Sequence, residues 1–232
     1  MFKHIPFASL YTAEHDGLKS RYHFSFAEYH NPLNVHYGVL RVMNDDIISP
    51  QSGFDTHPHY DMEIFTYVLR GTLTHQDSMG HKEELTKGTI QYMSAGTGIS
   101  HSELNEGEEE VHLIQTWIFP SQKGLNPGYK TKRYGEKERL NRWLHLMGRN
   151  GVDSVIPINQ DVNIYVTQME SHQSLLFGLG SQRQLYVKVM EGEAMINDKL
   201  FQTGDAGKSD EDLFVQTKKQ SAHILVIEMA KR

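Results

Sequence analysis

The chain contains no cysteine among its 232 residues. This absence excludes a disulfide framework, a thiolate metal site and a cysteine nucleophile. No apolar run approaches the roughly 20 residues that a membrane-spanning helix needs. The first six residues, MFKHIP, also lack the apolar segment of a secretory signal. A cytoplasmic location without a membrane partner is therefore expected.

The sequence also lacks an excess of positively charged residues. The 23 Lys and Arg residues are outnumbered by 29 Asp and Glu residues, which gives a formal net charge of −6. This balance argues against nucleic-acid phosphates or an anionic membrane as direct partners. The length allows one large or two small domains with a sizeable core.

Helical periodicity is scarce, and strand signals dominate. Runs rich in β-branched and aromatic residues predict strands at residues 63–69, 72–75, 89–93 and 111–119. A hairpin turn is expected from Asp77 to Gly80, where glycine supplies a positive φ. Residues 120–134 are interpreted as a linker, a short helix is expected around 136–143, and strands resume from Ile164. Short strands at this spacing indicate a sandwich or barrel.

The second half of the chain echoes the first. The segment VLRGT at 68–72 is similar to VMEGE at 189–193, and KGT at 87–89 is similar to TGD at 203–205. Each copy has a strand that ends in glycine, one or two further strands and a glycine-led turn. The sequence therefore predicts an internal duplication of a β-unit, with a shorter hairpin in the second copy.

Histidine, in contrast, is abundant, with 14 residues scattered along the chain. His57 and His59 are two residues apart, and so are His101 and Glu103. On a β-strand this spacing puts both side chains of a pair on one face. Two such strands brought together would direct three imidazoles and one carboxylate to one point. That is a ligand set for a divalent transition metal.

The alternative interpretation of a single His-x-His pair is a surface or structural role. Two pairs, each flanked by glycine-rich turns, favour metal binding instead. At the corresponding positions of the second copy the chain carries Gly178, Gly180 and Thr217, and only isolated histidines such as His172 and His223 remain nearby. The sequence therefore predicts one metal site and not two.

Six segments narrow the fold and the function further. They are HFSFAEY at 23–29, LRVMNDD at 40–46, THPH at 56–59, DMEIFTYVL at 61–69, HQDSMG at 75–80 and MSAGTGISHSE at 93–103. They resemble the paired motifs of the cupin superfamily and, more closely, the pirin family with its bacterial quercetin 2,3-dioxygenase-like members. The resemblance is strong from about residue 15 to 120 and weak beyond.

This resemblance implies an all-β bicupin made of two tandem antiparallel cupin-type β-barrels. Residues 1–130 are expected to form an N-terminal metal-binding barrel, and residues 131–232 a degenerate C-terminal barrel without metal ligands. The loss of the histidine pairs from the second copy agrees with a metal in the N-terminal barrel alone.

The carboxylate ligand has two candidates. The general cupin pattern supplies a glutamate a few residues after His-x-His, which is Glu63, whereas the pirin-like pattern uses the glutamate two residues after the third histidine, which is Glu103. Glu63 shares a strand face with His57 and His59 if that strand is unbroken. The expected ligands are His57, His59, His101 and Glu103. Glu63 is then a pocket residue that needs a hydrogen-bond partner.

Further side chains are candidates for the surroundings of the metal. His75, His112 and Gln115 could line the barrel or support the ligands, and Phe65, Tyr67 and Trp117 could wall an aromatic substrate pocket or simply pack in the core.

The family resemblance implies a metal-dependent dioxygenase that uses dioxygen to open quercetin or a related flavonol or phenol. The metal would bind the enolic oxygen, and Glu103 or Glu63 would act as the catalytic base. Fe is the expected metal, with Ni, Cu, Mn, Co and Zn as alternatives. The alternative functions are a non-enzymatic, metal- or redox-responsive co-regulator that binds a protein partner, and a purely structural metal site.

Overall fold

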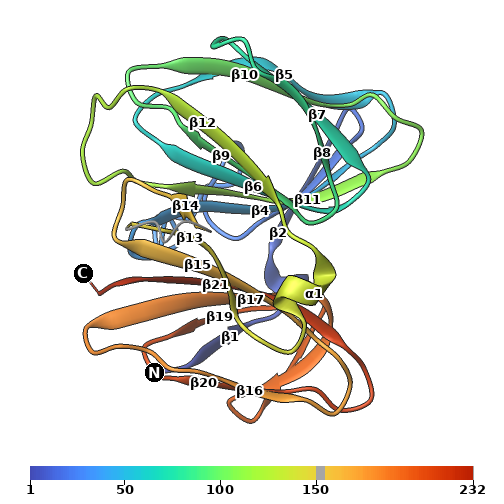
Figure 1. Ribbon diagram of the computed structural model, residues 1–232, viewed down its shortest axis with the longest axis vertical. Helices are drawn as coiled ribbons and strands as arrows, with labels where there is room; N and C mark the ends of the chain where they lie inside the picture. Colours follow the sequence, from blue (N-terminus) through green and yellow to red (C-terminus); the bar gives the residue numbers. More distant parts are fainter. Residues whose placement is uncertain (150–154, 232) are drawn as a thin grey trace. The chain divides into compact units, whose positions relative to one another are not determined.

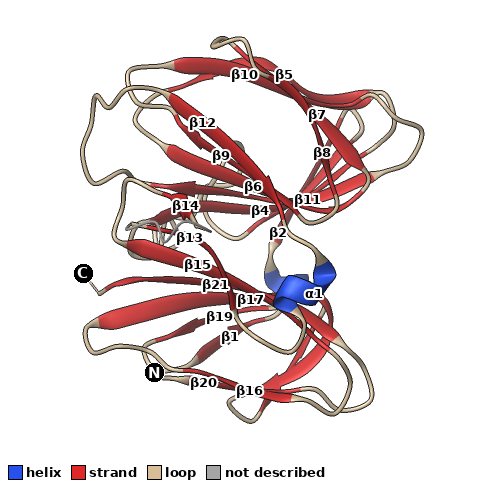
Figure 2. Ribbon diagram, in the orientation of Figure 1, coloured by secondary structure: helices blue, strands red, loops and turns tan. Residues whose placement is uncertain are grey.

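The protein is almost entirely β-structure (Figures 1 and 2). The computed structural model describes residues 1–149 and 155–231. Within these residues the helices are a 3-10 turn at Phe7–Ser9 and the short helix α1 (Glu136–Arg139). The helix lies inside the predicted range of 136–143. No helix of the described residues is long and apolar enough to cross a membrane.

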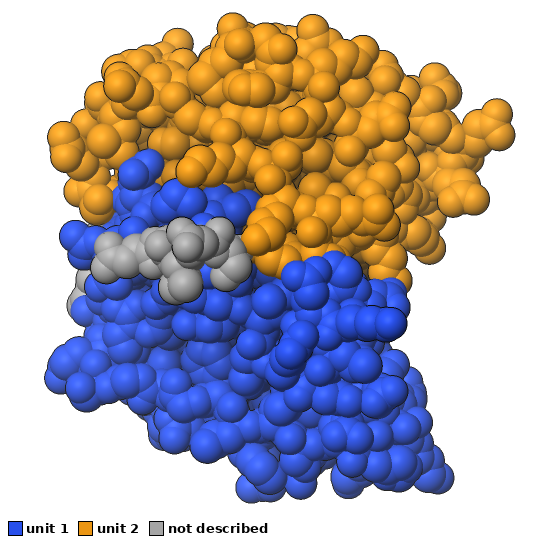
Figure 3. All heavy atoms as spheres, viewed as in Figure 1, with its two compact units in different colours: residues 1–10, 135–232 blue, residues 11–134 orange. Residues whose placement is uncertain are grey.

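The chain divides into two compact units, which Figure 3 colours separately. The N-terminal unit is Tyr11–Tyr134, and the C-terminal unit combines Met1–Leu10 with Gly135–Arg232. This division differs from the expected boundary at residue 130, because the first ten residues belong to the C-terminal unit. Their strand β1 (Lys3–Ile5) pairs with β19 (Ala206–Ser209). A three-residue strand carries no sequence signal for a partner 200 residues away.

Two antiparallel sheets build the N-terminal unit and face each other in Figure 1. The smaller sheet has the order β5 (Ser52–His59), β10 (Ile99–Asn105), β7 (Thr72–Asp77) and β8 (Lys82–Thr86). The larger sheet has the order β12 (Gly128–Arg133), β9 (Thr89–Ser94), β6 (Glu63–Arg70), β11 (Val111–Ile118), β4 (Leu40–Ile48), β3 (Leu18–Tyr22) and β2 (Tyr11–His15). Part of the space between the sheets is filled by Val68, Leu73, Leu85, Val111 and Leu113.

The C-terminal unit has a sheet of the order β1, β19, β17 (Arg183–Ile196), β21 (Ala222–Ala230), β15 (Val162–Met169), β13 (Leu144–Gly148) and β14 (Ile156–Pro157). Three further strands complete it: β16 (Ser174–Phe177), β18 (Lys199–Gln202) and β20 (Leu213–Gln216). The strands β18 and β20 pair with β17, and β16 pairs with β20. Its core is apolar and includes Leu185, Phe201 and Ile224.

The four strands predicted in the N-terminal half are confirmed as β6, β7, β9 and β11. The linker prediction for residues 120–134 is wrong, because β12 lies within it and pairs antiparallel with β9. This strand lies at the edge of its sheet and carries Lys130 and Lys132. Lysines weaken the sequence pattern that predicts a strand, but at an edge they protect the sheet from aggregation. Strands also resume earlier than Ile164, at β13 and β14.

Equivalent glycines support the predicted duplication. The N–H of Gly88 donates to Val68 O at 3.0 Å, and the N–H of Gly204 donates to Val189 O at 2.7 Å. Val68 and Val189 are the first residues of the two similar segments noted in the sequence. The second glycine pair, Gly71 and Gly192, has φ angles of 77° and 84°. A Cβ atom on either would meet a backbone carbonyl within 2.7 Å, so both copies need glycine here.

Candidate metal centre

Three imidazoles converge on the inner face of the smaller sheet. His57 on β5 is the cross-strand partner of His101 on β10, and His59 pairs with Ile99. The ring centroids of His57, His59 and His101 lie 4.6–4.9 Å from one another. The two Nε2 atoms of His59 and His101 are 3.0 Å apart. The i, i+2 spacing thus places the three side chains together as the sequence predicts.

The electrostatics of this cluster keep His59 and His101 neutral. Burial, together with the neighbouring histidines, lowers the pKa of His59 to about 3 and the pKa of His101 to about 3. The Nδ1–H of His57 donates to Asp55 O at 2.7 Å, so its Nε2 carries the free lone pair. Neutral imidazole nitrogens are the form that binds borderline divalent metals.

Glu103 lies in an adjoining, fully buried position. A bulge between His101 and Glu103 shifts the pairing of β10 with β5. Thr66 Oγ1 on β6 donates to one carboxylate oxygen at 3.1 Å, and Gln115 Nε2 on β11 donates to the other at 2.5 Å. Burial raises the pKa of this carboxyl, with the neighbouring imidazoles and both hydrogen bonds opposing the shift. A bound cation would favour its anionic form.

Glu63 does not join the histidine cluster. The strand that was assumed to run from His57 to Glu63 is broken by a turn in which Asp61 has a φ of 48°. Glu63 and Thr66 are three residues apart on β6, so their side chains point to opposite faces, and it is Thr66 that reaches Glu103. The carboxylate of Glu63 instead accepts hydrogen bonds from Tyr92 Oη and Ser94 Oγ. It has the partners that its burial requires, at a position away from the imidazoles.

His75 lies on the same face as Glu103, which is its cross-strand partner. Its Nε2 is 3.3 Å from Asp77 Oδ2, and that oxygen is 2.9 Å from Nδ1 of His81. The ring of Tyr129 on β12 stacks on both His75 and His81. The sequence marked His75 only as a possible lining residue. Asp77 follows His75 at the i, i+2 spacing, so the same strand signal could have found it. Tyr129 could not be found in this way, because its proximity to His75 depends on the pairing of distant strands.

The remaining candidates separate by strand face. Trp117 is half-buried and its ring packs edge-on against His59 at 4.7 Å. Phe65 and Tyr67 are fully buried on the face of β6 opposite to Thr66, so core packing describes them better than a substrate wall. His112 is bound to Asp45 at 2.6 Å and does not line the cluster.

The described residues form two groups whose ligand atoms are close enough to hold a metal ion. The first group is His57, His59 and His101, and the second is His75, His101 and Glu103. Within the described chain, Nδ1 of His75 and Nδ1 of His101 are buried without a hydrogen-bond partner. Buried polar atoms without a partner are costly unless a ligand satisfies them. The residues present therefore fit a divalent transition metal, and both groups lie in the N-terminal unit.

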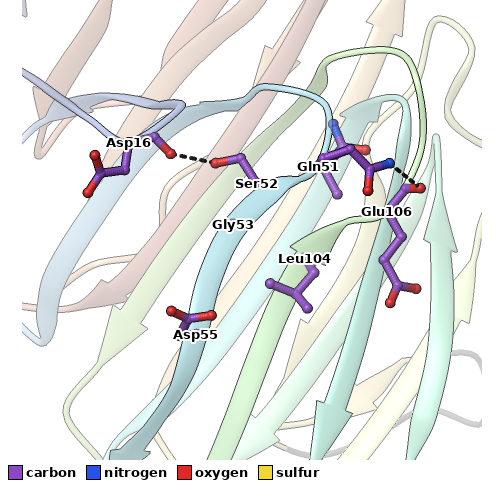
Figure 4. A pocket seen from close by; sticks show the side chains of 8 residues that line it. Asp16, Gln51, Ser52, Gly53, Asp55, Leu104 and Glu106 are labelled. Atoms are coloured by element: carbon purple, nitrogen blue, oxygen red, sulfur yellow. Dashed lines mark hydrogen bonds between the residues drawn. The ribbon is translucent and has the colours of Figure 1, made fainter.

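A separate pocket of about 410 Å³ lies beside β5 and β10 (Figure 4). It is lined by Asp16, Gln51, Ser52, Gly53, Asp55, Leu104, Asn105 and Glu106. Ser52 Oγ donates to Asp16 O, and Gln51 Nε2 donates to Glu106 O. None of the three clustered imidazoles lines this pocket, so it is distinct from the candidate metal centre.

Fold and site together define a bicupin with its candidate metal centre in the N-terminal unit. The family model "Pirin" matches residues 7–118, and the model "Quercetinase C-terminal cupin domain" matches residues 145–229. The chain belongs to the pirin family.

Individual relatives agree with this assignment. A pirin-like protein of Caulobacter vibrioides is 36% identical over 99% of this chain and 100% of its own. The quercetin 2,3-dioxygenase of Escherichia coli K12 is 40% identical over 83% of each chain. The crystal structure of the bacterial pirin YhhW from Escherichia coli in complex with nickel(II) has a TM-score of 0.94, 33% identity and full coverage of both chains. The nickel complex and the His/Glu cluster support a divalent metal in this protein.

A buried acid on the larger sheet has a strongly shifted titration. Asp46 on β4 is 1% exposed, and burial together with the carboxyls of Asp45 and Glu103 raises its pKa to about 7. The pKa in the unfolded chain is near 3.8. Between these values the folded protein keeps a proton that the unfolded chain has lost. The stability that the protonated form contributes is therefore lost as the pH rises from about 4 to 7.

The Asp46→Asn variant should be more stable than the wild type at pH 8. At pH 4.5 this gain in stability should be much smaller. The gain at pH 8 can reach roughly 4 kcal/mol, since one pKa unit corresponds to about 1.36 kcal/mol. Urea unfolding of the metal-free proteins at the two pH values measures it. Asp55→Asn, at an exposed position, is the matched control. An equal effect of Asp46→Asn at both pH values would contradict the raised pKa.

Proposed function

We propose that this protein is a metal-dependent dioxygenase that acts on quercetin or a related flavonol or phenol. The observation that carries the proposal is the cluster of three imidazoles beside a buried glutamate in a family member. His57, His59, His101 and Glu103 would hold the metal, and Fe is the metal we expect. The relative named quercetin 2,3-dioxygenase supports the substrate class.

The chemistry that such a metal supplies is Lewis-acid activation of an enolic oxygen and electron exchange with dioxygen. The chain's own residues would orient and desolvate the substrate. Trp117 packs against His59, and the ring of Phe26 meets Trp117 edge-on at 5.3 Å. Half-buried aromatic side chains at this position are suited to contact with a planar aromatic substrate.

Glu103 is the residue that we assign as the catalytic base. Its carboxylate lies beside the imidazole cluster, where it could accept a proton from a substrate bound at the metal. The hydrogen bonds from Thr66 and Gln115 fix its orientation, and Trp117 Nε1 in turn donates to Gln115 Oε1 at 3.3 Å. The proton leaving the substrate's enol would go to the Glu103 carboxylate. Glu63 lies on the face of β6 opposite to Thr66, where it accepts from Tyr92 and Ser94 and is directed away from the imidazoles.

The test is elemental analysis of protein purified without chelator, followed by oxygen-electrode measurements with quercetin. We expect about one transition metal ion per chain and quercetin-dependent oxygen uptake. His57→Ala should reduce that uptake at least about tenfold, because it removes one imidazole of the cluster.

The controls separate this enzyme from the other metal-site functions. Oxygen uptake that persists unchanged in His57→Ala would come from free metal and would count against the proposal. Stoichiometric Zn without oxygen uptake, on any flavonol tried and after Fe or Ni replacement, would instead favour a structural metal or a metal-loaded co-regulator.

A further inference from the structure

We propose that His75 is a further metal ligand, so that one ion has two overlapping positions: an outer one at His57, His59 and His101, and an inner one at His75, His101 and Glu103. The inner three residues are all buried, and each offers a ligand atom within 4.8 Å of the others. His101 belongs to both positions and is the pivot between them. The inference rests on metal binding in the proposed function and is independent of flavonol oxidation.

The protonation of His75 supports its role as a ligand. Asp77 is a carboxylate whose Oδ2 can only accept from Nε2 of His75, at 3.3 Å. The proton of the neutral ring is therefore on Nε2, and Nδ1 carries a bare lone pair. Within the described chain that nitrogen is buried and has no hydrogen-bond partner. A metal-bound histidine characteristically donates its second ring N–H to a carboxylate, which is the arrangement that Asp77 provides.

The surroundings of Asp77 hold this pair rigidly. Asp77 Oδ1 accepts from the backbone N–H groups of Met79 at 2.9 Å and His81 at 3.1 Å. The turn that the sequence predicted from Asp77 to Gly80 thus orients the carboxylate. Tyr129 stacks on the ring of His75 at a centroid distance of 4.7 Å and an interplanar angle of 16°. A simple core histidine would not need a carboxylate, a stacked ring and a fixed tautomer together.

Asp77→Asn is the sharpest single test, because it changes the tautomer of His75, and besides this only the side-chain contact of Asp77 with His81 is altered. Asn Oδ1 can keep both backbone N–H partners, while its amide group donates to Nε2 of His75 and moves the ring proton to Nδ1. We expect Ni(II) affinity to fall about tenfold or more in Asp77→Asn and in His75→Gln, as measured by competition with a chelator. His112→Gln is the matched control, since His112 also pairs with an aspartate but lies outside the cluster.

A double-variant cycle distinguishes two positions from one. His57→Ala should still bind one Ni(II) per chain through the inner position, and the double variant His57→Ala/His75→Gln should lose that binding. Cu(II) electron paramagnetic resonance should show nitrogen coupling in His57→Ala that decreases in the double variant.

The inference is overturned if Asp77→Asn and His75→Gln bind Ni(II) as tightly as the wild type and leave the Cu(II) spectrum unchanged. Circular dichroism and thermal unfolding show whether each variant is folded. If a variant does not fold, nitrogen counting by pulsed resonance on Cu(II)-loaded wild-type protein decides the question. Two positions predict a mixture of a three-imidazole species and a two-imidazole species, so a single three-imidazole species would contradict His75 as a ligand. These readouts measure metal binding, so they test the inference even if the protein shows no turnover with quercetin.

Discussion

Replacing His101 with alanine should almost abolish metal binding. His101 is the one imidazole shared by both groups of potential ligands. It is also the cross-strand partner of His57 on one side and of Asp77 on the other, so its ring connects three strands of the smaller sheet. Changes in residues that merely support a ligand cost 10–100-fold in metal affinity, and loss of a shared ligand should cost about 100-fold or more. Elemental analysis and Ni(II) titration measure this effect.

The matched control for this prediction is His36→Ala. His36 is an exposed histidine of the same unit, whose Nδ1–H donates to the Gly38 carbonyl at 3.1 Å. It should bind Ni(II) like the wild type, and both variants should unfold cooperatively. Full metal loading of a folded His101→Ala protein would show that the cluster is not the metal site.

The placement of the three imidazoles follows from sequence because strand periodicity is local. An i, i+2 pair shares a face whatever the strand's partner is. The glycine-marked turns then indicate where each strand starts, and β6, β7, β9 and β11 are found where they are predicted. The sequence could not reveal the register, which places His101 opposite both His57 and Asp77.

Features that depend on distant pairing escaped prediction. Glu63 seemed suitable only while β5 and β6 were treated as one strand, and the turn at Asp61 removes that parity. His75 comes close to Glu103 through the pairing of β7 with β10, and Tyr129 comes close to His75 because β12 joins the larger sheet. The contacts of His75 with Glu103 and with Tyr129 join residues 28 and 54 positions apart in the chain, which local propensity does not record.

The bulge beside Glu103 depends on a glycine in the neighbouring strand. Gly53 on β5 is the Cα partner of Leu104 and has a φ of 152°. A Cβ atom at this position would lie 2.3 Å from Glu103 O and 2.7 Å from the Leu104 Cα. Both atoms belong to the backbone, so no side-chain rotation can relieve the overlap. Figure 4 shows Gly53 and Leu104 on adjacent strands at the pocket that Asp16 and Asp55 also line.

Gly53→Ala should therefore destabilise the protein by about 3 kcal/mol or more and weaken metal binding as well, because β10 must move and Glu103 moves with it. Gly124→Ala is the control, since Gly124 also has a positive φ, of 69°, but has nothing within 4 Å of its added Cβ. The control should lose only about 1–2 kcal/mol, the ordinary cost of a left-handed backbone for alanine, and bind Ni(II) normally. Urea unfolding and Ni(II) titration of both variants give the comparison. Equal losses of stability in the two would mean that the approach of β5 to β10 does not constrain Glu103, whereas a selective loss of Ni(II) affinity in Gly53→Ala would tie the metal centre to the backbone of β5.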